Sequence, residues 1–150
     1  MYARRDGEGI KCRPVTGVEV DNLERAPIEL VLPGDSRYMR LARLMASGVA
    51  TAIGLGLDAV EDVRTAVDEV CSTLIEVADG QPIRLVFAIS PKTLTVTGET
   101  ETDGTSRQPD DDRLALSHQI LQVVTDSHEF TRSNGIATFR IAIPLNDPNV

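Results

Sequence analysis

Two adjacent carboxylates, Asp68 and Glu69, interrupt the otherwise apolar helical pattern of TAVDEVCSTLIE, residues 65–76. Carboxylates in such a setting form either a solvated helix edge or part of a binding site that uses their charge. Polar side chains recur here at intervals of three or four residues, which aligns them in one stripe along a helix. The stripe consists of Asp62, Thr65, Glu69, Thr73 and Glu76. Asp68 lies one further helical step round and is predicted to be solvated surface, and periodicity alone favours the same interpretation for Glu69.

Three arginines dominate the segment before this helix. Arg37, Arg40 and Arg43 recur at three-residue steps, and no Asp or Glu occurs between Ser36 and Leu57. The following segment is strongly acidic. It contains one basic residue, Arg64, and six acidic residues, Asp58, Glu61, Asp62, Asp68, Glu69 and Glu76. Either the arginines pair with this acidic helix, or they recognise an acidic partner through the bidentate carboxylate contacts that Arg favours. The sequence leaves both interpretations open.

The composition bounds the class of protein. The chain has 150 residues, 41% of them hydrophobic, and no Trp, so we expect a single domain with a core of Leu, Ile, Val and Ala. A formal net charge of -8 argues against nucleic acid or an anionic membrane as the main partner. No apolar run is long enough to span a bilayer, and the first residues lack the apolar core of a signal peptide. We therefore expect a cytoplasmic protein.

The cysteines and histidines show no metal-binding pattern. Cys12 and Cys71 form neither a metal spacing nor a disulfide framework. Cys71 falls within the helical pattern and is predicted to be a small buried side chain, whereas Cys12 is predicted to be a free thiol. His118 and His128 have no further ligands at metal spacing and are predicted to be structural.

The predicted order of elements is β-α-α-β-β-α-β-β after a flexible tail. The tail, residues 1–27, mixes Gly, Pro and charged residues without a period. Strands are predicted over 28–32, 83–89, 94–100, 128–132 and 136–143, and helices over 37–53, 58–78 and 114–125. Helices separated by hairpins favour an antiparallel sheet with helices layered on it. Residues 28–150 are therefore predicted to form one α+β domain, a two-layer sandwich of mixed, mainly antiparallel sheet with the helices on one face.

Local signals predict how elements begin, end and face the core. Asn134-Gly135 is predicted to close the last hairpin. Asp58, with Glu61 three residues later, matches the reciprocal capping pattern of a helix start. Apolar spacing predicts inward faces made of Leu41, Leu44, Met45, Gly48 and Ala52 on the first helix, of Val60, Val63, Val67, Val70, Leu74 and Val77 on the second, and of Leu116, Ile120, Val123 and Val124 on the third.

The stretch EDVRTAVDEVCSTLI, residues 61–75, follows a strand and a helix and resembles the first motif of the anti-sigma factor/serine kinase family of the RsbW and SpoIIAB type. Within it, AVDEVC is similar to actinobacterial members of the stress-response group. The resemblance extends over roughly residues 28–143 and implies the histidine kinase-like ATPase fold, shared with DNA gyrase and MutL. In the family a Glu on this helix is the proposed general base, and an Asn four residues later coordinates the magnesium ion that bridges the ATP phosphates. The resemblance assigns these places to Glu69 and Thr73, so a hydroxyl replaces the amide oxygen as metal ligand.

The adenine-recognition motif of the family, D-x-G-x-G, is not reproduced. It corresponds to TGETETDG, residues 97–104. The resemblance offers Glu99, Asp103 and Gly104 as cofactor-binding residues there, with an uncertain register.

The glycine-rich phosphate turn of the family is also altered. It corresponds to Arg113-Leu114-Ala115-Leu116 at the start of the third helix. Ala115 adds a methyl group where backbone amides must approach the phosphates, while Arg113 offers a cation. Three acids, residues 110–112, would repel a triphosphate, although they also suit a helix start. The resemblance therefore implies that ATP and Mg²⁺ bind weakly or not at all.

The resemblance also implies partners. In the family the first helix grips the sigma factor and the anti-anti-sigma protein, and Arg43 falls where a partner-contacting arginine occurs, with Arg37 and Arg40 beside it. The family dimerises through this region and the adjoining strand edge, so a homodimer is expected. The leading interpretation is an anti-sigma factor that sequesters an alternative sigma factor and is released by a STAS-type antagonist. The alternative is an ATP-dependent serine/threonine kinase that phosphorylates the antagonist, and a third is an adaptor that binds neither nucleotide nor sigma factor.

Overall fold

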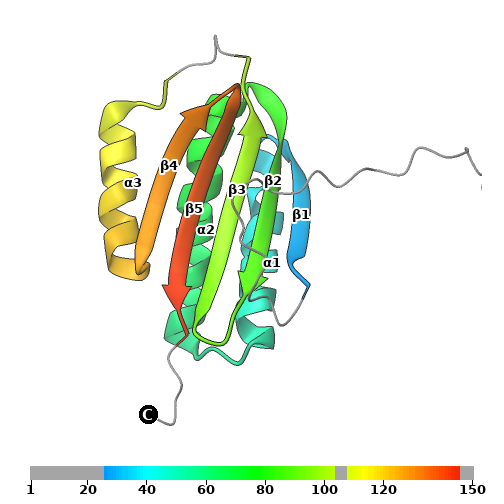
Figure 1. The fold of residues 1–150 in the computed structure, drawn as a ribbon, viewed down its shortest axis with the longest axis vertical. Helices are drawn as coiled ribbons and strands as arrows, with labels where there is room; N and C mark the ends of the chain where they lie inside the picture. The colour runs from blue at the N-terminus through cyan, green and yellow to red at the C-terminus, as the bar shows by residue number, and fades with distance from the viewer. Residues whose placement is uncertain (1–25, 104–107, 146–150) are drawn as a thin grey trace, which may run out of the picture.

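Alternating apolar residues in five segments build one antiparallel sheet, ordered β1-β2-β3-β5-β4 (Figure 1). The computed structural model describes residues 26–103 and 108–145, so most of the predicted tail and Gly104 lie outside the described residues. The elements are β1 (Ile28–Gly34), a 3-10 turn (Ser36–Tyr38), α1 (Met39–Ala52), α2 (Leu57–Ala78), β2 (Gly80–Ile89), β3 (Thr93–Glu101), α3 (Asp111–Val124), β4 (Ser127–Ser133) and β5 (Ile136–Pro144). The predicted order of elements is confirmed.

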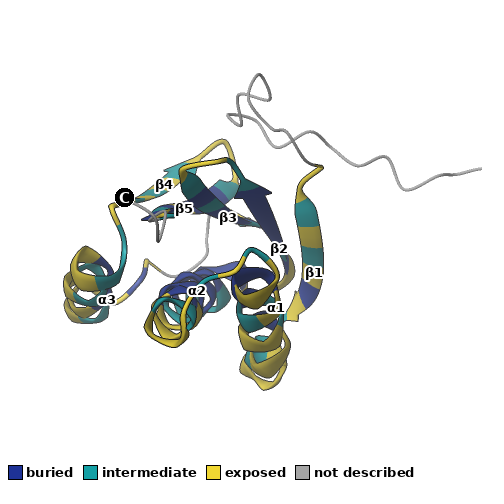
Figure 2. Ribbon diagram, turned by 90° about the horizontal axis from the view of Figure 1, so that it is seen from below, coloured by how far each residue is buried: buried dark blue, intermediate teal, exposed yellow. Residues whose placement is uncertain are grey.

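All three α-helices lie on one face of the sheet (Figure 2). Among the described residues every strand pair is antiparallel, from β1 with β2 to β4 with β5. The predicted α+β sandwich is therefore confirmed. The long helix α2 is central and packs against β2, β3 and β5 as well as against both other helices.

The chain reversals follow local backbone chemistry. Asn134 and Gly135 have φ angles of 52° and 74°, and they close the β4–β5 hairpin as predicted. Asp79, the C-cap of α2, also has a positive φ of 47°. The predicted reciprocal cap of α2 is wrong, because the N-cap is Gly56, which has no side chain to accept a hydrogen bond. Glu61 instead pairs with Arg64, one turn further along.

The predicted inward stripe of α2 is the centre of the core. Val63, Val67, Val70, Leu74 and Val77 are all 0% exposed. Val60, at the start of the same stripe, is partly buried and packs against this core.

The predicted inward face of α1 is largely wrong. The buried residues are Ala42, Ala46, Val49 and Ala50. Leu41 and Leu44 are 45% and 63% exposed, and only Met45 of the predicted set packs partly against the core. Alanines on the inner side let the α1 backbone lie close to α2, which leaves the leucine stripe facing outward.

The predicted inward face of α3 is also partly wrong. Its buried residues are Ser117 and Leu121, and Val124 packs partly against the core. Leu116 and Val123 are 57% and 85% exposed. α3 therefore rests on the rest of the domain through a narrow stripe with little apolar surface.

Gly98 is the point where β3 passes closest to α2. A Cβ atom at this position would lie 2.5 Å from Leu74 Cδ1 and 2.8 Å from Val70 Cγ1. The absence of a side chain at Gly98 therefore lets α2 pack directly onto the sheet.

Candidate functional site

The polar stripe of α2 is the surface on which α3 lies. Ser117 Oγ donates a hydrogen bond of 2.7 Å to Glu69 Oε2. Further along, the Asp110 backbone N–H donates to Glu76 Oε1 at 3.1 Å. Because Glu69 meets the later residue of α3 and Glu76 the earlier one, the two helices run antiparallel. The intervals of three and four residues seen in the sequence therefore mark a helix–helix contact.

Thr73 lies between these two contacts on the same stripe of α2. It is only 3% exposed, so the residue is shielded from solvent. Glu69 and Thr73, assigned to one site by the resemblance, are thus neighbours on one helix face, and Ser117 joins them. Ser117 was missed from the sequence, although its spacing of four from Arg113 and from Leu121 places it on the inner stripe of α3.

Carboxylates of the chain itself surround the first turn of α3. Asp110, the N-cap, accepts a hydrogen bond from the Asp112 N–H at 3.3 Å. Glu76 pairs with Arg113 at 3.5 Å in addition to its bond with the Asp110 N–H. The cation predicted to meet a phosphate is therefore paired within the chain. Ala115 is exposed on α3.

The residues predicted near the adenine do not gather around Glu69. Gly98 faces α2, so the alternation of β3 points Glu99 to the opposite, helix-free face of the sheet. There Glu99 lies opposite Arg84 in the strand register. Burial raises the pKa of the Glu99 carboxyl, and the nearby Arg84 charge partly opposes this. Asp103 is exposed beyond the end of β3, and Gly104 lies outside the described residues.

These contacts decide whether a magnesium-bound nucleotide fits the structure as folded. The Glu69 carboxylate is bonded to Ser117, and Thr73 is shielded. At the start of α3, where phosphates would meet backbone amides, Asp110 and Glu76 already accept N–H groups. A nucleotide that used these groups would have to displace the hydrogen bonds that they make within the chain.

The opposite side of α2 faces α1, where Arg43 pairs with Asp68. The guanidinium donates two hydrogen bonds, Nε to Oδ1 at 2.7 Å and Nη2 to Oδ2 at 3.0 Å. This bond raises the pKa of Arg43. Asp68 is half-buried, so its prediction as plain solvated surface is wrong. For Arg43 the structure shows the first of the two interpretations, pairing with the acidic helix.

The other two arginines differ from Arg43. Arg37 pairs with Asp35 at 2.7 Å within the turn before α1. Arg40 is exposed and forms no ion pair within residues 26–103 and 108–145. It lies next to the exposed Leu41 and one turn from Leu44. We call Arg40, Leu41 and Leu44 the outer α1 face.

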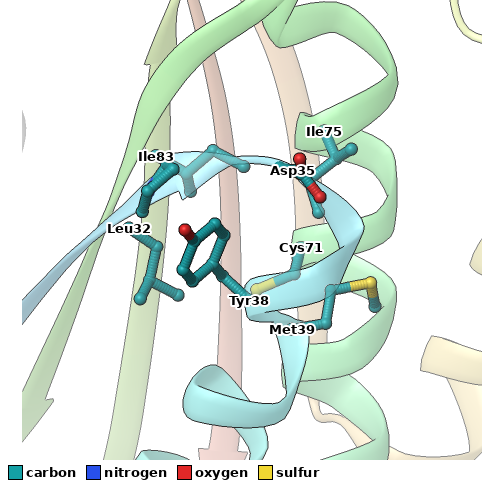
Figure 3. A pocket seen from close by; sticks show the side chains of 8 residues that line it. Leu32, Asp35, Tyr38, Met39, Cys71, Ile75 and Ile83 are labelled. Atoms are coloured by element: carbon teal, nitrogen blue, oxygen red, sulfur yellow. The ribbon is translucent and has the colours of Figure 1, made fainter.

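A small apolar hollow lies between β1, the 3-10 turn, β2, α1 and α2 (Figure 3). Its lining residues are Leu32, Pro33, Asp35, Tyr38, Met39, Cys71, Ile75 and Ile83. Cys71 and Ile75 come from the α1 side of α2, so the hollow is distinct from the Glu69–Ser117 contact. Burial raises the pKa of the Cys71 thiol to about 12.

Cys71 is expected to be chemically inert in the folded protein. In a Cys12→Ser variant, reaction with a thiol reagent near pH 8 should be about a hundredfold or more slower than in urea, because the thiolate is the nucleophile. Absorbance of the released chromophore measures both rates. Equal rates would show that the Cys71 side of the hollow opens readily.

Two imidazoles connect α3 to the sheet. The rings of His118 and His128 lie 4.9 Å apart between centroids, tilted by 35°. Burial, and then the His118 charge, lower the pKa of His128. The described residues contain no group of three or more His, Cys, Asp or Glu side chains placed to hold a metal ion.

Acid is expected to destabilise the protein through His128. The unfolded chain takes up this proton near pH 6.5, whereas the folded chain takes it up only at lower pH. The unfolded state thus binds more protons between the two values, and stability falls as the pH drops through that window. Urea unfolding between about pH 7.5 and 5.5 should show a weaker pH dependence for His128→Gln than for the wild type. An identical dependence would contradict this assignment.

Comparison with known proteins places the fold in a family. Residues 32–135, more than half of the chain, match the histidine kinase-like ATPase domain, and the chain belongs to this family. None of the helices in the described part of the chain has the length and apolarity to cross a bilayer.

Among individual proteins, the chain is similar to serine-protein kinases named RsbW. The protein from Bacillus thuringiensis strain Al Hakam is 31% identical over 72 residues, which are 46% of this chain and 45% of the relative. The one from Bacillus cereus strain B4264 is 32% identical over 65 residues, 41% of each chain. The chain thus spans less than half the length of these relatives. A crystal structure of the RsbU and RsbW domains of a Mycobacterium tuberculosis protein shares the fold, with a TM-score of 0.65 and 13% identity over 83% of this chain and 34% of that one.

Proposed function

We propose that the chain is an anti-sigma factor that sequesters an alternative sigma factor in the cytoplasm and releases it when a STAS-type antagonist binds. The family and the similarity to RsbW proteins support a partner-switching role. The outer α1 face is the observation that carries the proposal for this chain.

This face combines features of a recognition surface. Leu44 is 63% and Leu41 is 45% exposed, next to the charged Arg40. Clustered apolar side chains beside an arginine are typical of the energetic centre of an interface. Arg43 contributes less directly, because binding an acidic partner would require it to leave Asp68.

Co-purification tests the proposal. The chain is mixed in turn with each alternative sigma factor of its source organism and examined by native mass spectrometry. We expect a stable complex with one sigma factor, which a STAS protein from the same organism dissociates. If the chain forms a complex with none of these sigma factors, the proposal is overturned. The masses also report whether the chain is a homodimer, as we propose.

A serine/threonine kinase that phosphorylates the antagonist is the second candidate. The position of Glu69 on the polar stripe of α2 favours it, because the resembled family carries its proposed general base at this place. The hydrogen bonds that Glu69 and the start of α3 make within the chain, together with the burial of Thr73, disfavour it. We therefore propose a nucleotide site that is degraded relative to active kinases.

Titration with fluorescent ATP and Mg²⁺, followed by phosphate transfer to the STAS protein, separates the two candidates. Weak or no binding without transfer is expected. Micromolar binding with transfer that Glu69→Gln abolishes would establish the kinase instead.

A further inference from the structure

α3 is attached to the domain through few buried apolar side chains. It has 14 residues, of which only Ser117 and Leu121 are buried, whereas α1 of equal length buries four apolar side chains. Leu116 and Val123 point to solvent. A helix that buries so little apolar surface gains little from the hydrophobic effect. Apart from Leu121, Val124 and the His118–His128 ring contact, its position therefore depends on the hydrogen bonds that it makes with α2.

The Ser117–Glu69 bond is the most central of these. Its length of 2.7 Å suits a hydroxyl that donates to a carboxylate, and Ser117 is only 1% exposed. A shielded hydrogen bond to an ionised group is stronger than a neutral one. The second attachment, from Glu76 to Asp110 and Arg113, lies at the exposed start of α3 and is open to solvent.

We propose that α3 is a detachable cover of the polar face of α2, and that the Ser117–Glu69 hydrogen bond sets the balance between its docked and undocked states. When α3 is docked, Thr73 is shielded from solvent and the Oε2 atom of the half-buried Glu69 carboxylate is occupied by the Ser117 hydroxyl. A ligand that needs this oxygen must displace the Ser117 hydroxyl, so its apparent affinity is reduced by the fraction of molecules in which α3 is docked. This inference concerns contacts within the chain and does not depend on which partner the outer α1 face binds.

Amide hydrogen exchange of the full chain, followed by mass spectrometry, tests the proposal. In the wild type, amides of α3 should exchange faster than those of β3 and β5, which open only on global unfolding. Ser117→Ala should speed exchange over residues 111–120 about tenfold, the factor expected for losing a hydrogen bond to a charged group, with little change in the central strands. Exchange of α3 at the same rate as the central strands in the wild type would overturn the proposal, whether or not the variant folds.

A double-mutant cycle and a matched control give the test its specificity. Glu69→Ala alone should match Ser117→Ala, and the double variant should exchange no faster than either, because both changes remove one bond. Thr125→Val removes another hydroxyl hydrogen bond of the same helix, to the Leu121 carbonyl at 2.6 Å, which does not reach α2. It should leave residues 111–120 unchanged. Additive effects in the cycle, or an equal effect of Thr125→Val, would show that this bond does not hold α3.

Discussion

Gly98→Val is expected to lower the free energy of unfolding by about 3 kcal/mol, at the upper end of the usual cost of overpacking. The first added carbon atom would overlap Leu74 Cδ1 at 2.5 Å and Val70 Cγ1 at 2.8 Å. Both side chains are 0% exposed and lie in the centre of the core. Both are packed in the core, so relief requires a strained rotamer or a shift of α2 away from the sheet.

Urea denaturation followed by circular dichroism measures this change. Gly48→Ala provides the control, because a Cβ at Gly48 meets no atom within 4 Å and the residue is exposed within α1. This variant should be more stable than the wild type by about 0.5–1 kcal/mol, since alanine favours a helix interior. If Gly98→Val lowers the free energy of unfolding by less than about 1 kcal/mol, the contact between β3 and α2 is not tightly packed, and the prediction is wrong.

Leu44→Asp is expected to weaken the proposed sigma-factor complex about a hundredfold, a loss of roughly 2.7 kcal/mol that is typical of a residue at the centre of an interface. Leu44 is 63% exposed and does not belong to the core, so the substitution should leave the isolated domain folded. A carboxylate there would also lie near Arg40 and reduce the positive potential offered to an acidic partner.

Val123→Asp is the matched control for this prediction. Val123 is 85% exposed, but it lies on α3, which α2 separates from α1 (Figure 2). Isothermal titration calorimetry with the sigma factor should detect no change for this variant. Equal losses for the two variants would place the partner elsewhere, or show that binding responds only to the added charge.

The order and type of the elements could be predicted because their signals are local. Asn134-Gly135 determines a hairpin within a few residues, and the gaps between Val63, Val67 and Val70 indicate one helix face. The inward faces of α1 and α3 could not be predicted in the same way. α1 carries two stripes, one of leucines and one of alanines, and the choice between them depends on how closely α2 approaches.

The candidate site was predictable only in part. Glu69 and Thr73 share a stripe that the spacing reveals, whereas Ser117 reaches Glu69 only through the placement of α3, which is distant in sequence. The position of Glu99 could have been judged from alternation, because its neighbour Gly98 continues the inward series of Leu94 and Val96. For Arg43 the sequence fits both pairing with the acidic helix and recognition of an acidic partner. Only the bidentate contact with Asp68 distinguishes the two interpretations.

The strand order also has a consequence for the speed of folding. The β2–β3 and β4–β5 ladders join consecutive strands and can form early as hairpins. The β1–β2 and β3–β5 ladders each enclose helices, so the chain must first close a long loop to make them. The β1–β2 ladder closes the longer of the two loops, because Gly34 pairs with Gly80 whereas Glu101 pairs with Ile136. This makes it the natural slow step and sets this domain among folders of intermediate rate.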